Sequence, residues 1–275
     1  RLYRRQQSAR SPATGFTLVA ATRRPSVVSL KVRTLWPHEL RFEVLSAVIF
    51  RNKWRESLLG RAASSSPDGK GLLFWLDPYH SQSLAADGLQ QFSMPLGGPA
   101  RPLTTALGLL AILAAAGREV LLVPGAGRMV WHGKSLARCD VRTAQCHVLP
   151  HPAGVVELDP DWAPQGNHIA FVEAREAGGL RTDKALLAWV HTHALWVWMR
   201  GQGAHGLIAA GTGTYAPQWS RDGLHLLYIR ENALWMIRVG GGASARILGP
   251  FPKAPDYFGF YGQPSFSFSF AWHKG

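Results

Sequence analysis

One twelve-residue phrase occurs twice in this chain. Residues 160–171 read PDWAPQGNHIAF, and residues 217–228 read PQWSRDGLHLLY. Both copies pass from a proline through a tryptophan to a glycine turn, and then into an apolar run typical of a strand. Two further matching phrases, ALWVW at 194–198 and ALWMI at 233–237, follow the two copies in the same order. Such repetition favours an array of similar structural units stacked side by side.

Weaker copies extend the array in both directions. With the tryptophan position as the marker, the copies begin near residues 65, 113, 162, 219 and 272, although the first two lack the tryptophan. The successive spacings are 48, 49, 57 and 53 residues. A four-stranded propeller blade takes about 40–50 residues, so the two longer repeats carry insertions. We therefore predict an all-β fold, a β-propeller of four-stranded blades, with six blades or, as the alternative, five.

We expect a single propeller domain over residues 14–275. Residues 1–13 are basic and contain serine and proline, which predicts a flexible N-terminal segment. Strand-like runs within residues 14–60 predict one N-terminal blade, although residues 45–59 could alternatively form a helix. N-terminal strands would then complete the blade that begins near residue 272.

The repeated phrase resembles the blade-opening motif of TolB-type, WD40-like β-propellers, in which Pro-x-Trp-Ser-Pro-Asp-Gly precedes an apolar strand. The match is good over residues 158–248 and partial over 64–157. The family includes the periplasmic TolB protein and the propeller domains of some serine peptidases. The resemblance therefore implies the fold without specifying an activity. The chain departs from the motif where Gln165 and Gly166 replace the Asp-Gly turn.

The residues of the phrase have structural roles of their own. Large flat side chains suit the widening gap between neighbouring sheets, which is where we expect Trp162, Trp219 and Trp272. The Asp-Gly pairs at 68–69 and 222–223 supply the positive φ angles of a tight hairpin. We assign these residues to the fold rather than to function.

The chain carries a formal net charge of +13. Such an excess favours attraction to an anionic polymer such as nucleic acid or a cell-wall polymer. The basic residues are scattered, however, and no run of five occurs. The alternative is an ordinary solvated surface that happens to be basic.

Cys139 and Cys146 flank the stretch DVRTAQ, which is typical of a hairpin turn. Paired strands beside such a turn can bring two cysteines within disulfide reach, so this pair is a disulfide candidate. The alternative is two unrelated small apolar residues. A disulfide would fit an oxidising compartment, and we expect an extracytoplasmic protein that is periplasmic, secreted or anchored.

No segment predicts a membrane span, because the apolar run at 106–116 has 11 residues where a spanning helix needs about 20. The chain has no Gly-x-Ser-x-Gly, no phosphate loop and no dinucleotide fingerprint. We therefore predict no catalytic residue and no cofactor. His191 and His193 would share one face of a strand as half of a metal site, but without a third ligand no metal is predicted. Asp159 and Asp161 are expected to organise the turn of the phrase.

Propeller topology predicts which loops gather on one face. Connections between the second and third strands of a blade leave the same face as connections between blades. The long segments at 77–90, 174–193 and 249–265 belong to this set. Because long loops on a rigid face commonly carry binding residues, the candidate binding residues are Arg175, Arg181, Lys184, Tyr257, Phe258 and Tyr261.

These observations favour a non-catalytic, monomeric propeller scaffold that binds a protein or peptide on its long-loop face or in its central channel. The first alternative is a hydrolase or lyase acting on a glycan or peptide at the channel mouth. Propellers can assemble such sites from single residues of several blades, which sequence motifs do not reveal. The second alternative is a module that binds an anionic polymer through the net charge.

Overall fold

The structure is a computed structural model, and part of the chain is described in it. Side chains are described for residues 70–74, 90–95, 97–106, 118–125, 129–211 and 213–251. For residues 17–19, 29–35, 39–44, 63–65, 75, 89 and 112–113 only the strand backbone is described. The N-terminal segment 1–13, the possible helix at 45–59 and the marker near 272 lie outside these residues.

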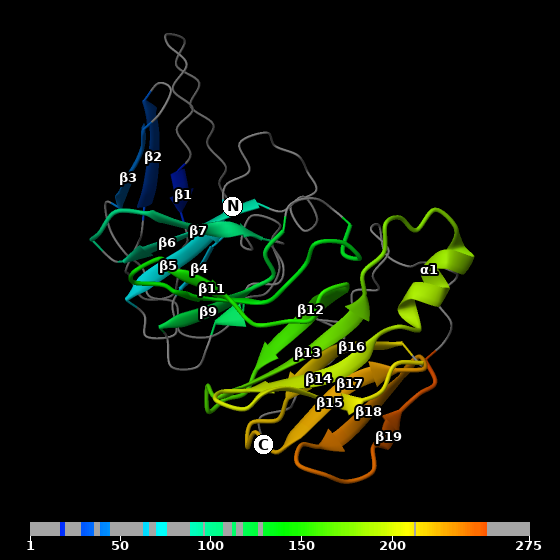
Figure 1. Ribbon diagram of the computed structural model, residues 1–275. Helices are drawn as coiled ribbons and strands as arrows, with labels where there is room; N and C mark the ends of the chain where they lie inside the picture. Colours follow the sequence, from blue (N-terminus) through cyan, green and yellow to red (C-terminus); the bar gives the residue numbers. More distant parts are fainter. Residues whose placement is uncertain are drawn as a thin grey trace.

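Strands β4 to β19 form four antiparallel sheets of four strands each, and each of these sheets is built from consecutive strands (Figure 1). The first comprises β4 (Ala63–Ser65), β5 (Gly71–Trp75), β6 (Leu89–Pro95) and β7 (Arg101–Ala106). The second comprises β8 (Ile112–Leu113), β9 (Glu119–Leu122), β10 (Ala137–Asp140) and β11 (Cys146–Val148). The third comprises β12 (Val155–Trp162), β13 (His168–Arg175), β14 (Ala194–Met199) and β15 (Gly203–Ile208). The fourth comprises β16 (Thr214–Trp219), β17 (His225–Arg230), β18 (Ala233–Arg238) and β19 (Ala245–Leu248).

The marker positions of the repeated phrase align with these sheets. Ser65, Leu113, Trp162 and Trp219 are each the last residue of the first strand of a sheet. The predicted all-β architecture of four-stranded blades is therefore confirmed. Where one N-terminal blade is predicted, the described strands β1 (Thr17–Val19), β2 (Ser29–Leu35) and β3 (Glu39–Val44) form a three-stranded sheet. The count of six blades stays a prediction.

Apolar clusters fill the spaces between consecutive sheets. One cluster joins the first and second sheets, and another joins the third and fourth. The largest joins the second and third sheets and reaches into the fourth. The innermost strands of neighbouring sheets also contact each other, β8 with β12 and β12 with β16. This face-to-face packing around the first strands is the arrangement of propeller blades.

Trp162 and Trp219 lie between their own sheet and the preceding one, as predicted. Each is 6% exposed. Trp219 packs in the cluster between the third and fourth sheets, and its Nε1 donates to the carbonyl oxygen of Asp161 at 3.2 Å. Trp162 packs against the second sheet, where the guanidinium carbon of Arg138 lies 6.0 Å from its ring centre. The repeated tryptophan therefore acts as a wedge between blades.

Asp159 and Asp161 join neighbouring blades, which differs from their predicted role in the local turn. The Asp159 carboxylate accepts the N–H of Ala216 at 3.1 Å, and the Asp161 carboxylate accepts the N–H of Trp219 at 2.7 Å. Both acceptors lie on β12 and both donors on β16. Each strand has a bulge at this point, where Asp159 and Ala216 both adopt a φ of 47°. In a regular ladder these side chains would point away from the neighbouring blade, and the bulges turn them toward it.

Cys139 and Cys146 are joined in a disulfide. They are direct partners in the register of β10 and β11, beside the hairpin turn that the sequence predicts. Cys139 is fully buried against the first sheet. The bond therefore fastens the outer strand β11 to the interior of its blade.

We expect reduction of this disulfide to lower the free energy of unfolding by about 2–3 kcal/mol, because the bond closes a short loop and restricts the unfolded chain. Denaturant unfolding of the oxidised and reduced protein measures the change. The double variant C139A/C146A should lose stability as well and should not respond to reductant. One free thiol or more per chain in the denatured, unreduced protein would contradict the bond.

The insertion at 174–193 contains a helix that the sequence analysis did not predict. Helix α1 (Asp183–Val190) begins at Thr182, whose hydroxyl accepts the N–H of Ala185 at 3.1 Å. The predicted shared strand face of His191 and His193 is wrong, because His191 caps the helix and His193 precedes β14. Among the described residues, no helix is long and apolar enough to cross a membrane.

Candidate functional site

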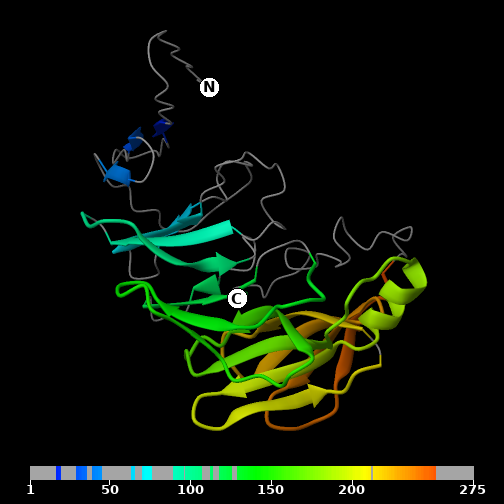
Figure 2. The same ribbon diagram turned by 45° about the horizontal axis from the view of Figure 1, so that its top comes forward.

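The described connections that gather on the predicted face come from three sheets. They are the second-to-third connections 123–136, 176–193 and 231–232, and the links between and after blades at 149–154, 209–213 and 249–251. We call these segments the long-loop face. In two views, α1 stands beyond the end of β13 at this edge of the third sheet (Figures 1 and 2).

Loops of two neighbouring blades are tied together on this face. The N–H of Ala177 donates to the carbonyl oxygen of Trp131 at 2.9 Å. The carboxylate of Glu176 accepts the N–H of Gly133 at 2.8 Å, and its Oε1 lies 2.9 Å from Nδ1 of His132. These contacts fix the insertion against the loop of the preceding blade, so the long-loop face has a defined shape.

Helix α1 is anchored by its C-terminal half. Trp189 is 4% exposed, and its Nε1 donates to the carbonyl oxygen of Arg175 at 2.8 Å. Its ring meets that of Trp131 edge-on, with 6.2 Å between ring centres. Below it, Gly213 has a φ of +67°, and a Cβ at that position would lie 2.8 Å from Val190. The helix therefore packs closely on the backbone that leads into β16.

Three predicted binding residues belong to this anchored segment. Arg175 ends β13, Arg181 precedes the helix and Lys184 lies in its first turn, and all three side chains are exposed. None of them forms an ion pair or side-chain hydrogen bond with another described residue. The other three predicted residues, Tyr257, Phe258 and Tyr261, lie outside the described residues.

The sequence analysis did not single out the connection 123–136, although the rule that selected the other long loops also selects this one. It joins the second strand of its blade to the third. Its Trp131 supports α1, and its Lys134 is buried. The signal was the length of the connection, which is visible only once β9 and β10 are recognised as strands.

His193 lies buried beneath the helix and is not a candidate ligand or base. It is 0% exposed, and its ring packs edge-on against Trp189 at 4.5 Å and Tyr215 at 4.9 Å. Its Nδ1 lies 3.1 Å from the carbonyl oxygen of Thr214, which places the ring proton on Nδ1. Burial lowers the pKa of His193 to about 4, so the ring is neutral at physiological pH.

Glu157 and Glu173 are a pair of carboxyl groups near this face, and burial raises the pKa of both. They are direct partners across β12 and β13, and the Glu157 carboxylate accepts the N–H of Leu136 at 2.8 Å. Burial raises the pKa of Glu157 to about 7, against that hydrogen bond and nearby His151, and the Glu173 carboxylate adds to the rise. A carboxyl group that exchanges its proton near neutral pH can act as a general acid. Glu157 is only 3% exposed, however, so a substrate has little access to it.

No cluster that could hold a metal ion occurs among the described residues. In this part of the chain, no three His, Cys, Asp or Glu side chains lie close enough together to share an ion. Two histidines of the long-loop face have polar partners, His132 in Glu176 and His193 in the carbonyl oxygen of Thr214.

Comparison with known proteins finds likeness in structure alone. No family model matches the chain. No curated protein sequence is significantly similar to it. The oligogalacturonate lyase of Vibrio parahaemolyticus matches with a TM-score of 0.52 and 14% identity, over 85% of this chain and 59% of the lyase.

Two further solved structures give lower scores. Putative TolB from Agrobacterium tumefaciens matches over 68% of this chain and 61% of its own, with 16% identity and a TM-score of 0.44. A puromycin-hydrolyzing peptidase from Mycobacterium tuberculosis matches over 86% of this chain and 38% of its own, with 16% identity and a TM-score of 0.47. The chain spans less than two thirds of each of the three proteins.

The match with the lyase and the four stacked meanders together define a β-propeller fold. A propeller is also the fold that the resemblance of the repeated phrase to the TolB-type motif implies. At these identities the likeness extends to the fold and not to activity.

Proposed function

We propose that this propeller is a non-catalytic scaffold whose long-loop face binds an acidic segment of a protein or peptide. The observation that carries the proposal is a group of three exposed basic side chains, Arg175, Arg181 and Lys184, on a segment that is itself fixed. Tyr257, Phe258 and Tyr261 are proposed to extend the same surface.

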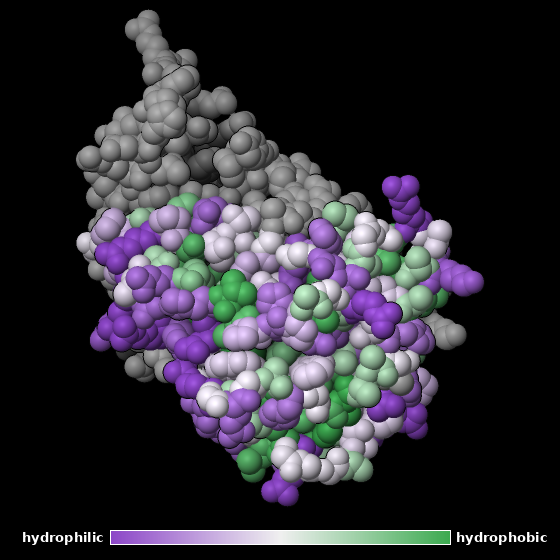
Figure 3. All heavy atoms as spheres, viewed as in Figure 1, coloured by the Kyte–Doolittle hydropathy of each residue, from purple (hydrophilic) through white to green (hydrophobic). Residues whose placement is uncertain are grey.

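Charge supports an acidic partner. The exposed charged groups of the segment 174–193 are three basic side chains and one acid, Asp183, whereas the Glu176 carboxylate is already engaged with the loop beside it. Hydrophilic residues project around the position of α1 at the upper right of Figure 3. Basic groups without intramolecular partners are available to a ligand and lose no internal ion pair on binding.

Rigidity supports binding as well. The buried Trp189 and the hydrogen bonds of Ala177 and Glu176 hold the segment in one place before any partner arrives. A preorganised surface loses less conformational entropy on association than a loop that must become ordered. We also propose that the protein acts as a monomer outside the cytoplasm, where the Cys139–Cys146 disulfide would be maintained.

Peptide selection tests this proposal. A phage-displayed random peptide library selected on the whole chain should be enriched in Asp- and Glu-rich peptides. The charge-reversal variant R175E/R181E/K184E should bind the enriched peptides at least about tenfold more weakly, since each lost charge contact contributes on the order of 0.5–1 kcal/mol. Fluorescence anisotropy with labelled peptides measures the affinities.

The matched control reverses three exposed arginines of the fourth sheet. Arg221 lies in the first-to-second turn, Arg238 ends the third strand, and Arg246 lies on the outer strand. R221E/R238E/R246E should bind within about twofold of the wild type. Equal loss in both variants would instead support the polymer-binding alternative, with affinity that falls steeply with salt for any polyanion. Selection of neutral peptides that bind both variants normally would rule out the proposed surface.

The alternative with a specific observation in its favour is a hydrolase or lyase. The raised pKa of Glu157 would suit a general acid, and the oligogalacturonate lyase is among the similar structures. Incubation with oligogalacturonate and with a peptide mixture, followed by mass spectrometry, tests this alternative. Product formation that disappears in E157Q would replace the scaffold proposal.

A further inference from the structure

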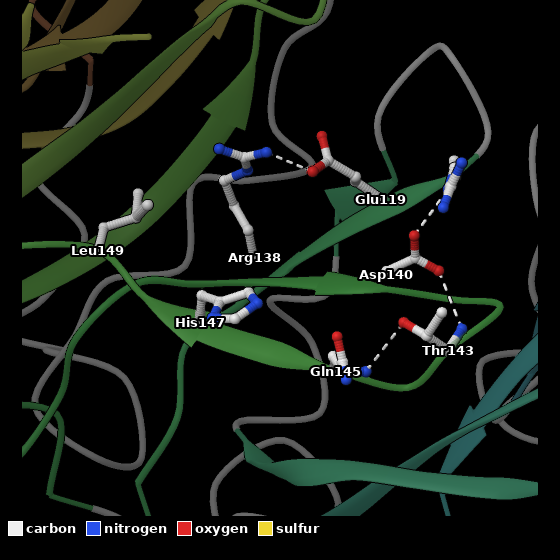
Figure 4. Close-up of a pocket in the computed structure, with 8 residues that line it drawn as sticks. Glu119, Arg138, Asp140, Thr143, Gln145, His147 and Leu149 are labelled. Atoms are coloured by element: carbon white, nitrogen blue, oxygen red, sulfur yellow. Dashed lines mark hydrogen bonds and ion pairs between the residues drawn. The ribbon is translucent and has the colours of Figure 1, made fainter. Parts of the chain in front are cut away.

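A polar pocket lies on the side of the second sheet that faces the third, and it reaches the long-loop face only at Leu149. It has a volume of about 380 Å³, within the usual range of small-molecule sites, and its residues come from β9, β10, β11, the turn between the last two and the residues next to β9 and β11 (Figure 4). Strand register brings its walls together, since Arg138 on β10 lies directly opposite His147 on β11. The ionisable side chains that line the pocket are Arg118, Glu119, Arg138, Asp140 and His147.

The carboxylates of the pocket are already occupied. Asp140 accepts Nε of Arg118 at 2.6 Å and also the backbone N–H groups of Arg142 and Thr143. Glu119 accepts a guanidinium on each oxygen, from Arg138 and, at 3.1 Å, from Arg200 of the third sheet. Because both carboxylates already accept hydrogen bonds, they offer little to a cationic ligand. They also neutralise the positive charge of the arginines only in part.

The guanidinium groups retain donors. Two arginines and two carboxylates line the pocket, and Arg200 of the third sheet, which pairs with Glu119, brings the cluster to one positive charge in excess. Arg118 bonds to Asp140 through Nε and Arg200 bonds to Glu119 through one Nη, so these two bonds leave other N–H donors of both guanidinium groups unused. The buried Nε of Arg138 has no hydrogen-bond partner among the described residues. His147 is exposed at the rim and can add a further donor.

The arginines are also held in position. The guanidinium of Arg138 lies 6.0 Å from the ring centre of Trp162 and 5.7 Å from that of Trp198. The Cys139–Cys146 disulfide fastens β11, and therefore His147, beside it. Fixed guanidinium groups with spare donors match the planar or tetrahedral oxygens of an oxyanion, to which they can bond bidentately.

We propose that this pocket binds a small ligand through an oxyanion group, a carboxylate or a phosphate. The charged side chains of this pocket are not those of the surface formed by Arg175, Arg181 and Lys184, and the proposal does not depend on the function proposed for that surface. The ligand would displace no internal pair, because it uses donors that the two carboxylates leave free.

Titration with two simple anions tests the proposal. Acetate and inorganic phosphate are added separately to the ¹⁵N-labelled whole chain at constant ionic strength, with chloride as the balancing anion. We expect saturable shifts of the Nε–H signals of Arg118 and Arg138 in the NMR spectrum. The tighter of the two anions identifies the ligand as a carboxylate or a phosphate compound.

Variants separate this pocket from general attraction of anions. Arg118 is 60% exposed, so R118A should fold normally, and its dissociation constant should rise about tenfold or more. R118K keeps the charge but not the planar fork of donors, so its dissociation constant should rise less than that of R118A but should still rise. R221A, which removes an exposed arginine of the fourth sheet, should leave binding unchanged. Shifts that do not saturate, or that persist equally in R118A, would overturn the proposal.

Discussion

Replacement of Trp219 by alanine should lower the free energy of unfolding by about 3–5 kcal/mol, the usual cost of removing a buried tryptophan. Trp219 is 6% exposed in the cluster between the third and fourth sheets and stacks near His168, with 6.0 Å between ring centres. Its removal leaves a cavity between two blades that the rigid sheets close only in part. Denaturant unfolding followed by circular dichroism measures the loss.

The conservative variant separates packing from hydrogen bonding. Trp219→Phe fills most of the slot but removes the N–H that donates to the carbonyl oxygen of Asp161, so we expect a loss of about 1–2 kcal/mol. Trp235, which is partly exposed and packs against the same cluster, is the control, and Trp235→Ala should cost clearly less than Trp219→Ala. A loss below about 1 kcal/mol for Trp219→Ala would contradict its role as a wedge.

The blade openings could be predicted because the same physical problem recurs in each repeat. Every blade needs a residue to fill the gap beside it and a glycine to turn into its second strand, so Trp162 and Trp219 recur with Gly166 and Gly223. The structure places both tryptophans at the end of a first strand. The contacts of Asp159 and Asp161 with the next blade were less visible, since they depend on a bulge that the sequence does not mark.

The insertion was harder to predict because nothing in the repeat corresponds to it. Helix α1 has the ordinary signals of a helix, Thr182 as the N-cap and Asp183 in the first turn. These signals cover only two residues, whereas His191 and His193 alternate as the residues of a strand do. The strand that this alternation predicts is wrong. An insertion has to be analysed by local rules rather than by the repeat that contains it.

The polar pocket of the second sheet could not be predicted from the sequence for a different reason. Arg138 of the second sheet and Arg200 of the third are distant in the sequence and meet at Glu119 only when the two blades pack together. The hairpin between Cys139 and Cys146 fixes one part of this arrangement, because their pairing sets Arg138 opposite His147. Contacts between blades require the three-dimensional packing and have no sequence motif.

Glu157 should make the protein less stable as the pH rises. Burial raises its pKa from an ordinary value of 4.5 to about 7 in the folded state. Between these two values the folded protein holds a proton that the unfolded chain has released, so the free energy of unfolding falls as pH increases through this window. A shift of this size corresponds to about 3 kcal/mol once the pH exceeds the folded pKa.

Glu157→Gln isolates this effect. The amide oxygen can still accept the N–H of Leu136, but the side chain no longer ionises in a buried position. The variant should match the wild type near pH 4.5 and exceed its stability by up to about 3 kcal/mol above pH 7. The two curves have to be compared because other groups also change the free energy of unfolding with pH. Burial raises the pKa of Asp161 to about 6, which adds to the fall in stability. Burial lowers the pKa of His193 to about 4, which opposes that fall.

The control for this comparison is Glu231→Gln, at the exposed turn between β17 and β18. Its stability should follow the wild-type curve across the whole pH range. Equal curves for Glu157→Gln and the wild type above pH 7 would show that the Glu157 carboxylate is solvated when charged. Glu157, which is 3% exposed in the structure, would then have to become accessible to water when it ionises. The enzyme alternative requires such access.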